Sequence, residues 1–90
     1  MGRLENRIFK LNDTIAALRQ EQRQAREELV FHEHLNDDAQ RDAAGGSPFD
    51  RSEARETAAD VARIEAHIAE LDRKIQAAES KRDALLARLG

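Results

Sequence analysis

The sequence predicts an all-α fold, an antiparallel two-helix coiled-coil hairpin, and leaves open a dimer of hairpins in the form of a four-helix bundle. Three observations lead to this prediction. Charged residues make up 37% of the 90 residues and aromatic residues only 3%, which is typical of long helices and leaves too few large side chains for a wide globular core. Apolar residues recur every three or four positions. Glycine and proline interrupt that pattern once, near the middle of the chain. We expect residues 1–90 to form a single hairpin domain.

The first predicted helix covers about residues 3–44. Its apolar stripe alternates steps of four and three residues, and we assign Ile8, Ile15, Gln22, Leu29 and Asn36 to the a positions of the heptads. A period of 3.5 residues kept over five heptads indicates a coiled coil, although two amphipathic helices of an ordinary bundle would resemble it. The full stripe is Leu4, Ile8, Leu11, Ile15, Leu18, Gln22, Ala25, Leu29, His32, Asn36, Ala39 and Ala43.

The predicted turn covers residues 45–49. The stretch Ala44–Pro48 contains two of the four glycines and the only proline of the chain. Glycine suits the left-handed residue that ends a helix, and proline suits the first position of the next one. Ser47 is one candidate N-cap for that helix, with Pro48 after it, and Asp50 is a competing cap that follows a longer loop.

The second predicted helix covers about residues 50–89 and continues the same spacing. Its stripe is Ala54, Thr57, Val61, Ile64, Ile68, Leu71, Ile75, Ala78, Arg82, Leu85 and Leu89. When the chain folds back on itself, facing residues have numbers that add up to 93, and every a position then meets a d position. The centre of this register falls at Gly46 and Ser47, where the turn residues independently place the reversal. A parallel homodimer through the second helix is a further arrangement with complementary charges.

This register predicts individual pairings along the seam. A large residue faces a small one in Ile15–Ala78, and a polar residue faces a polar one in Asn36–Thr57. On the flank, Arg19 falls opposite Asp72. We expect Arg82 to lay its stem across the seam and to lift its charged head into water. The predicted hairpin seam consists of Leu11, Ile15, Leu18, Leu29, Val61, Ile64, Ile68, Leu71, Ile75 and Leu85.

Acidic residues gather around the predicted turn. The segment from Glu33 to Asp60 has a net charge of −5 and the rest of the chain +2, which together give the total of −3. Helix dipoles attract acids to a helix start but disfavour them near a helix end, where several of these residues lie. We therefore expect an acidic tip that binds a protein partner, or otherwise a divalent ion. The candidate tip residues are Asp37, Asp38, Asp42, Asp50 and Glu53.

Apolar residues also lie outside the stripe near the turn. Val30, Phe31, Leu35 and Phe49 either thicken the contact between the two helices or form a patch for self-association. The patch would continue the hairpin's own seam, so we expect a second copy of the chain, in a homodimer, to cover it.

Several classes of function are disfavoured by the sequence. We predict no enzyme, catalytic residue or cofactor, because no nucleophile–base pair or phosphate-binding loop is present. His34 and Asp38 share a helix face, but two ligands do not make a metal site. Nucleic-acid binding is disfavoured by the net negative charge, and we expect the basic strip His67, Lys74, Lys81 and Arg88 to be largely used against the first helix. No apolar run reaches membrane-spanning length, so we expect a cytoplasmic protein without a membrane partner.

Two stretches of the chain resemble the Gre and DksA groups, which enter the secondary channel of bacterial RNA polymerase. Residues 47–54, Ser-Pro-Phe-Asp-Arg-Ser-Glu-Ala, are similar to the tip of DksA-like proteins, and residues 62–75 are similar to their returning helix. The resemblance implies that Asp50 and Asp42 would act near the catalytic magnesium of the polymerase. The chain departs from these families because it has no cysteine for a zinc finger and no second globular domain.

The function expected from the sequence is that of a non-catalytic structural or adaptor protein. It would self-associate and present its acidic tip to a protein partner, whose identity the sequence does not specify. The alternative is a transcription-modulating factor that inserts the same tip into RNA polymerase.

Overall fold

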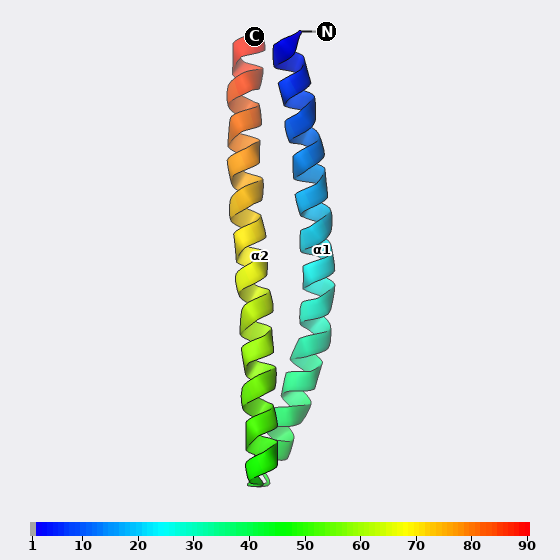
Figure 1. The fold of residues 1–90 in the computed structure, drawn as a ribbon, viewed down its shortest axis with the longest axis vertical. Helices are drawn as coiled ribbons and strands as arrows, with labels where there is room; N and C mark the ends of the chain where they lie inside the picture. Colours follow the sequence, from blue (N-terminus) through cyan, green and yellow to red (C-terminus); the bar gives the residue numbers. More distant parts are fainter. Residues whose placement is uncertain (1) are drawn as a thin grey trace. The chain divides into compact units, whose positions relative to one another are not determined.

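The computed structural model describes residues 2–90, which form two long helices joined by a short turn (Figure 1). Helix α1 spans Arg3–Ala43 and helix α2 spans Pro48–Leu89. The described residues contain no strand. The predicted all-α helical hairpin is therefore confirmed, whereas the dimer stays a prediction.

Helix α1 ends in a tightened turn. The amide of Gly45 donates to the carbonyl of Asp42 at 3.0 Å, and the amide of Gly46 donates to the carbonyl of Ala43 at 3.0 Å. Gly46 has a φ of +90°, in the left-handed region that residues with a Cβ rarely adopt. The glycine pair thus reverses the chain as its sequence predicts.

Of the two candidate caps, the structure has Ser47 at the start of α2. Its side-chain oxygen accepts a hydrogen bond from the amide of Asp50 at 3.4 Å, and its carbonyl accepts the first helical bond, from the amide of Arg51 at 3.0 Å. Helix α2 consequently begins at Pro48, in the position next to the cap where proline has no amide to lose.

The chain forms two compact units, and each contains part of both helices. Unit 1 comprises described residues 2–23 and Ala69–Gly90, and unit 2 comprises Gln24–Ile68. Within unit 1 the start of α1 lies beside the end of α2, and within unit 2 the turn joins the end of α1 to the start of α2 (Figure 1). The helices run antiparallel in each unit.

The core of unit 1 consists of large apolar side chains on the predicted stripe. Leu71 is only 2% exposed, and each buried side chain of this size contributes about 1.5–3 kcal/mol. Leu89 departs from the prediction, because it is 47% exposed. It is the last residue of α2, and no further helical turn covers it. The buried residues of unit 1 are Ile8, Ile15, Leu71, Ile75, Ala78 and Leu85, with Leu11 and Leu18 half-buried beside them.

The core of unit 2 is thinner. Only alanines, Ala25 and Ala54, are fully buried there. The larger seam residues Leu29, Val61, Ile64 and Ile68 are half-buried. Apart from Leu89, the predicted stripe is thus correct in both units, but the side chains of unit 2 remove less apolar surface from water.

Polar side chains cross the seam of unit 2. The hydroxyl of Thr57 donates to Oδ1 of Asn36 at 3.0 Å, which confirms the predicted pairing. The amide of Gln40 donates to the same Asn36 oxygen and to the carbonyl of Ala54, both at 3.0 Å. An asparagine at an a position fixes the register of a coiled coil, because a shifted register leaves its amide without partners.

The predicted flank pairing of Arg19 with Asp72 is wrong. Arg19 instead pairs with Glu79 at 2.7 Å. Side chains on a helix lean toward its N-terminus, so in an antiparallel pair these two long side chains lean toward each other. Asp72 accepts a hydrogen bond from Gln76 in its own helix at 2.7 Å.

Arg82 leaves the seam in the expected way. Its guanidinium donates to Oδ1 of Asn12 at 3.4 Å and to Oδ1 of Asp83 at 3.1 Å, so two side chains at the edge of the seam hold it. Over residues 2–90, neither helix has a segment apolar enough to cross a membrane.

Candidate functional site

An open groove of about 410 Å³ lies beside the turn, and we refer to it as the tip groove. Both helices contribute to it within unit 2. Because the turn is short, the residues shortly before it and those shortly after it line the same groove. The lining residues are Leu35, Asp38, Ala39 and Asp42 from α1 and Phe49, Asp50, Glu53 and Thr57 from α2.

The tip groove brings together most of the acidic residues singled out in the sequence. Asp38 forms an ion pair with Arg41 one turn away on the same helix. For the part of the chain that the structure describes, no ion pair involves Asp42, Asp50 or Glu53. Asp37 is exposed and does not line the groove. The groove therefore carries negative charge that the hairpin itself leaves largely uncompensated.

The predicted apolar patch is exposed and does not thicken the contact between the helices. Leu35 and Phe49 line the tip groove and are 40% and 69% exposed. Val30 and Phe31 are also exposed but lie outside the groove, and the Phe31 ring packs edge-on against His32, with ring centroids 5.5 Å apart. The tip groove thus combines exposed apolar side chains with carboxylates.

Two arginines near the turn, Arg51 and Arg55, lie on another surface. A groove of about 300 Å³ in unit 2 is lined by Arg51 and Arg55 together with Gln40 and small residues, and it contains no acidic side chain. Arg51 also donates to the carbonyl of Gly46 in the turn. The sequence predicts a tip with net negative charge, and the structure adds that Arg51 and Arg55 line a different groove from its acidic residues.

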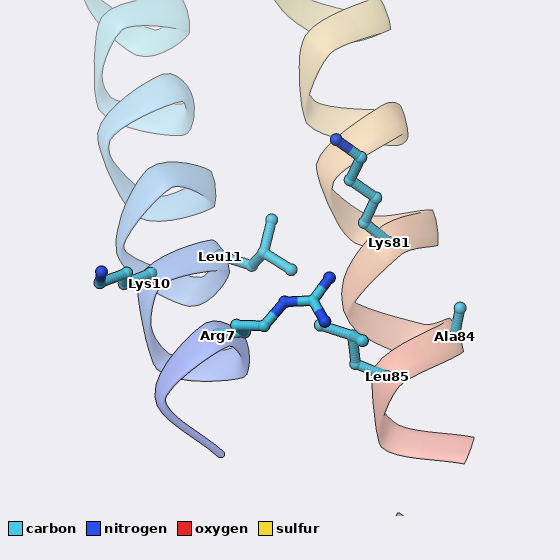
Figure 2. A pocket seen from close by; sticks show the side chains of 6 residues that line it. All are labelled: Arg7, Lys10, Leu11, Lys81, Ala84 and Leu85. Carbon is cyan, nitrogen blue, oxygen red and sulfur yellow. The ribbon is translucent and has the colours of Figure 1, made fainter. Parts of the chain in front are cut away.

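Unit 1 contains a groove that the sequence analysis missed. It has a volume of about 440 Å³, and we refer to it as the basic groove. Figure 2 shows Leu11 and Leu85 between the two helices, with the guanidinium of Arg7 reaching toward Leu85 and Lys10 extending to the outer side of α1. Its lining residues are Arg7, Lys10 and Leu11 from α1 and Lys81, Ala84 and Leu85 from α2.

A neighbouring groove extends this basic surface. It has a volume of about 360 Å³, shares Leu11 and Lys81 with the basic groove, and adds Lys74 and Leu18. The sequence analysis expected Lys74 and Lys81 to be used largely against the first helix. Both side chains are instead exposed. The signal in the sequence was the recurrence of lysine at g positions, next to the apolar seam.

The carboxyl of Glu70 on α2 has a lowered pKa. A hydrogen bond from Arg73, with Nε and Oε2 3.0 Å apart, and the charge of the same guanidinium lower the pKa of Glu70 below its ordinary value of 4.5. Desolvation opposes this lowering of the pKa, and the charge of Lys74 adds a smaller contribution that lowers it. Glu70 lines neither the tip groove nor the basic groove, so the shift reports a local contact on the surface of α2.

The described residues contain no group of three or more His, Asp or Glu side chains placed to hold a metal ion. His34 and Asp38 thus acquire no further ligand. No protein-family model, curated protein or solved structure matches this sequence. The tip groove and the basic groove are therefore the features of the molecule that bear on its function.

Proposed function

We propose that this chain is a non-catalytic, cytoplasmic coiled-coil adaptor that self-associates and presents its tip groove to a protein partner. The observation that supports this proposal is the composition of the groove. Exposed Phe49 and Leu35 lie among the carboxylates of Asp42, Asp50 and Glu53. Aromatic and aliphatic side chains provide binding energy when a partner covers them, and surrounding charges select which partner can do so.

The chemistry of the groove indicates the kind of partner. A segment with lysine or arginine on either side of an apolar residue would place its cations near Asp42 and Glu53 and its apolar side chain against Phe49. An amphipathic helix with that pattern fits an open groove between two helices. Such an interface has an apolar centre with a charged rim.

One observation also favours the alternative of a polymerase-binding factor. Asp42 and Asp50 are the residues to which the resemblance assigns a role, and they line the same groove from opposite helices. In that case the tip groove would meet RNA polymerase, and the carboxylates would act near its magnesium ion.

Affinity purification from the native cell tests the proposal with two groove variants and one control. The first variant is Leu35→Glu with Phe49→Glu, the second is Asp42→Asn with Asp50→Asn, and the control is Asp37→Asn outside the groove. We expect the wild type and the control to retain one partner and the apolar variant to lose it. Removal of the charges in the second variant should weaken the partner's binding without abolishing it. Charged residues at the rim of an interface contribute more to the choice of partner than to the binding energy.

The outcomes separate the two candidate functions. A partner that stays bound to the apolar variant would contradict the adaptor proposal. Recovery of RNA polymerase with the wild type and the apolar variant, but not with Asp42→Asn and Asp50→Asn, would establish the alternative instead.

A further inference from the structure

We propose that the basic groove of one copy receives the tip groove of a second copy, so that these two surfaces form the contact through which the chain self-associates. This inference rests on the self-association in the proposed function and names the surfaces that carry it. In the self-associated state the tip groove is then occupied by another hairpin, and a different protein partner would compete with that second copy for the same groove.

The charges of the two grooves are complementary. Arg7, Lys10 and Lys81 line the basic groove, which contains no acidic side chain. Asp42, Asp50 and Glu53 line the tip groove, which contains no basic side chain.

None of these six residues forms an ion pair within residues 2–90. Joining the grooves would therefore bring opposite charges together without breaking an ion pair inside the hairpin. Opposite charges also speed the encounter of two proteins.

The apolar parts of the two grooves also differ in a complementary way. In the basic groove the apolar floor is recessed, because Leu85 is buried, Leu11 is half-buried and Ala84 is small. In the tip groove Phe49 projects, with 69% of its surface exposed. A projecting aromatic ring and a recessed floor are the pairing that anchors many protein interfaces.

Each groove borders the seam of its own unit through the same heptad positions. Lys81 and Arg7 occupy g positions in unit 1, and Asp42 and Glu53 occupy g positions in unit 2. In coiled coils, charged residues at the e and g positions that border the a/d seam form salt bridges between helices and set the choice of partner. Two tip grooves would repel each other, as would two basic grooves, so the charges select the mixed pairing.

A charge-swap experiment tests this pairing by sedimentation equilibrium of the purified full chain. One variant carries Lys10→Glu and Lys81→Glu, and the other carries Asp42→Lys and Glu53→Lys. All four positions are exposed, and circular dichroism checks that each variant keeps its helices. We expect each variant alone to associate at least about tenfold more weakly than the wild type. An equimolar mixture should recover association, because reversed grooves complement each other again.

A milder variant, Lys10→Gln with Lys81→Gln, removes the two positive charges without reversing them and should also weaken association. It replaces the charge-reversal variant if that variant fails to fold. Undiminished association of the single variants, or a mixture that stays monomeric beside an associating wild type, would overturn the groove pairing and leave self-association through another surface. A wild type that is monomeric at every concentration would overturn the inference together with that part of the proposed function. Partner capture by the tip groove would still stand or fall on the affinity purification.

Discussion

Two leucines of α2 show how strongly the position of a residue on its helix determines its burial. Leu71 is 2% exposed and Leu86 is 45% exposed, although both lie in the same helix and the same unit. Leu71 occupies a d position and Leu86 the e position that follows Leu85. One step along the helix thus moves a side chain from the seam toward solvent.

We expect Leu71→Ala to lower the free energy of unfolding by about 2–5 kcal/mol, because it removes buried methyl groups and leaves a cavity. Leu86→Ala makes the same chemical change at an exposed site and should alter it by about 0.5 kcal/mol or less. Urea denaturation followed by circular dichroism measures both. Equal losses for the two variants would mean that the seam is assigned to the wrong positions.

The contact between Arg73 and Glu70 gives a second prediction at this scale. Arg73→Ala should raise the pKa of Glu70 toward its ordinary value, because the guanidinium is the largest cause of the shift. Lys74→Ala should raise this pKa less, since Lys74 is the weakest cause. NMR titration of the Glu70 carboxyl measures both changes. A larger change in the pKa of Glu70 for Lys74→Ala than for Arg73→Ala would contradict this prediction.

The direction of this shift also fixes its pH dependence. The pKa of Glu70 is lower in the folded chain than in the unfolded chain, so the folded state binds the proton more weakly. The contact therefore stabilises the folded state above the ordinary pKa of 4.5, and this contribution is lost as the pH falls through the lowered value.

At the scale of single residues, the sequence predicts burial better than partners. The stripe is correct from Leu4 to Leu85, because heptad spacing and burial follow from the same helix geometry. The partner of Arg19 is not predictable from register alone. Asp72 and Glu79 are one heptad apart on the same flank, and the lean of the side chains favours Glu79.

The contact between the two helices differs in kind between the two units. Unit 1 has large buried side chains, whereas unit 2 has alanines and the polar contact between Asn36 and Thr57. The smaller apolar core of unit 2 can be predicted from the sequence, since the stripe includes Asn36, Ala39 and Thr57 near the turn. It does not reveal the role of Gln40, whose amide reaches both Asn36 and the carbonyl of Ala54 from outside the stripe.

A double-mutant cycle measures how strongly the polar contact couples the helices. Asn36→Ala and Thr57→Ala each remove one partner of the hydrogen bond, and we expect a coupling energy of about 0.5–1.5 kcal/mol. Arg19→Ala with Glu79→Ala provides a comparison pair at a more exposed site, where we expect about 0.2–1 kcal/mol. Urea denaturation of the single and double variants supplies both values. A coupling near zero between Asn36 and Thr57 would show that the register is held by apolar packing alone.

For the whole molecule, the structure predicts that the two units differ in local stability. Backbone amides exchange with solvent through local opening, which is easier where less apolar surface is buried. We expect amides near Leu71 and Ile75 in unit 1 to exchange more slowly than those near Val61 and Ile64 in unit 2. Hydrogen exchange followed by mass spectrometry, at a protein concentration that keeps the chain monomeric, measures the difference. Uniform protection would show that both units open together.

The grooves mark the limit of prediction from the sequence for the whole molecule. Asp42 and Glu53 are recognisable as acids near a turn, but only the folded chain shows that they line one surface with Phe49 while Arg51 and Arg55 line another. The basic groove depends on Arg7 and Lys81, which are distant in sequence and adjacent only because the chain reverses. Which charged residues share a surface is therefore known only once both helices are placed side by side.

The position of the chain ends in unit 1 has a practical consequence. Arg7 lies near the start of α1 and Leu85 near the end of α2, and both line the basic groove. A fluorescent protein or an epitope fused to either end therefore emerges next to this groove and can crowd it, while the tip groove is bordered by the turn. Fusions with long, flexible linkers are the ones to use in assays of assembly, and a bulky fusion at an end is itself a means of blocking the basic groove.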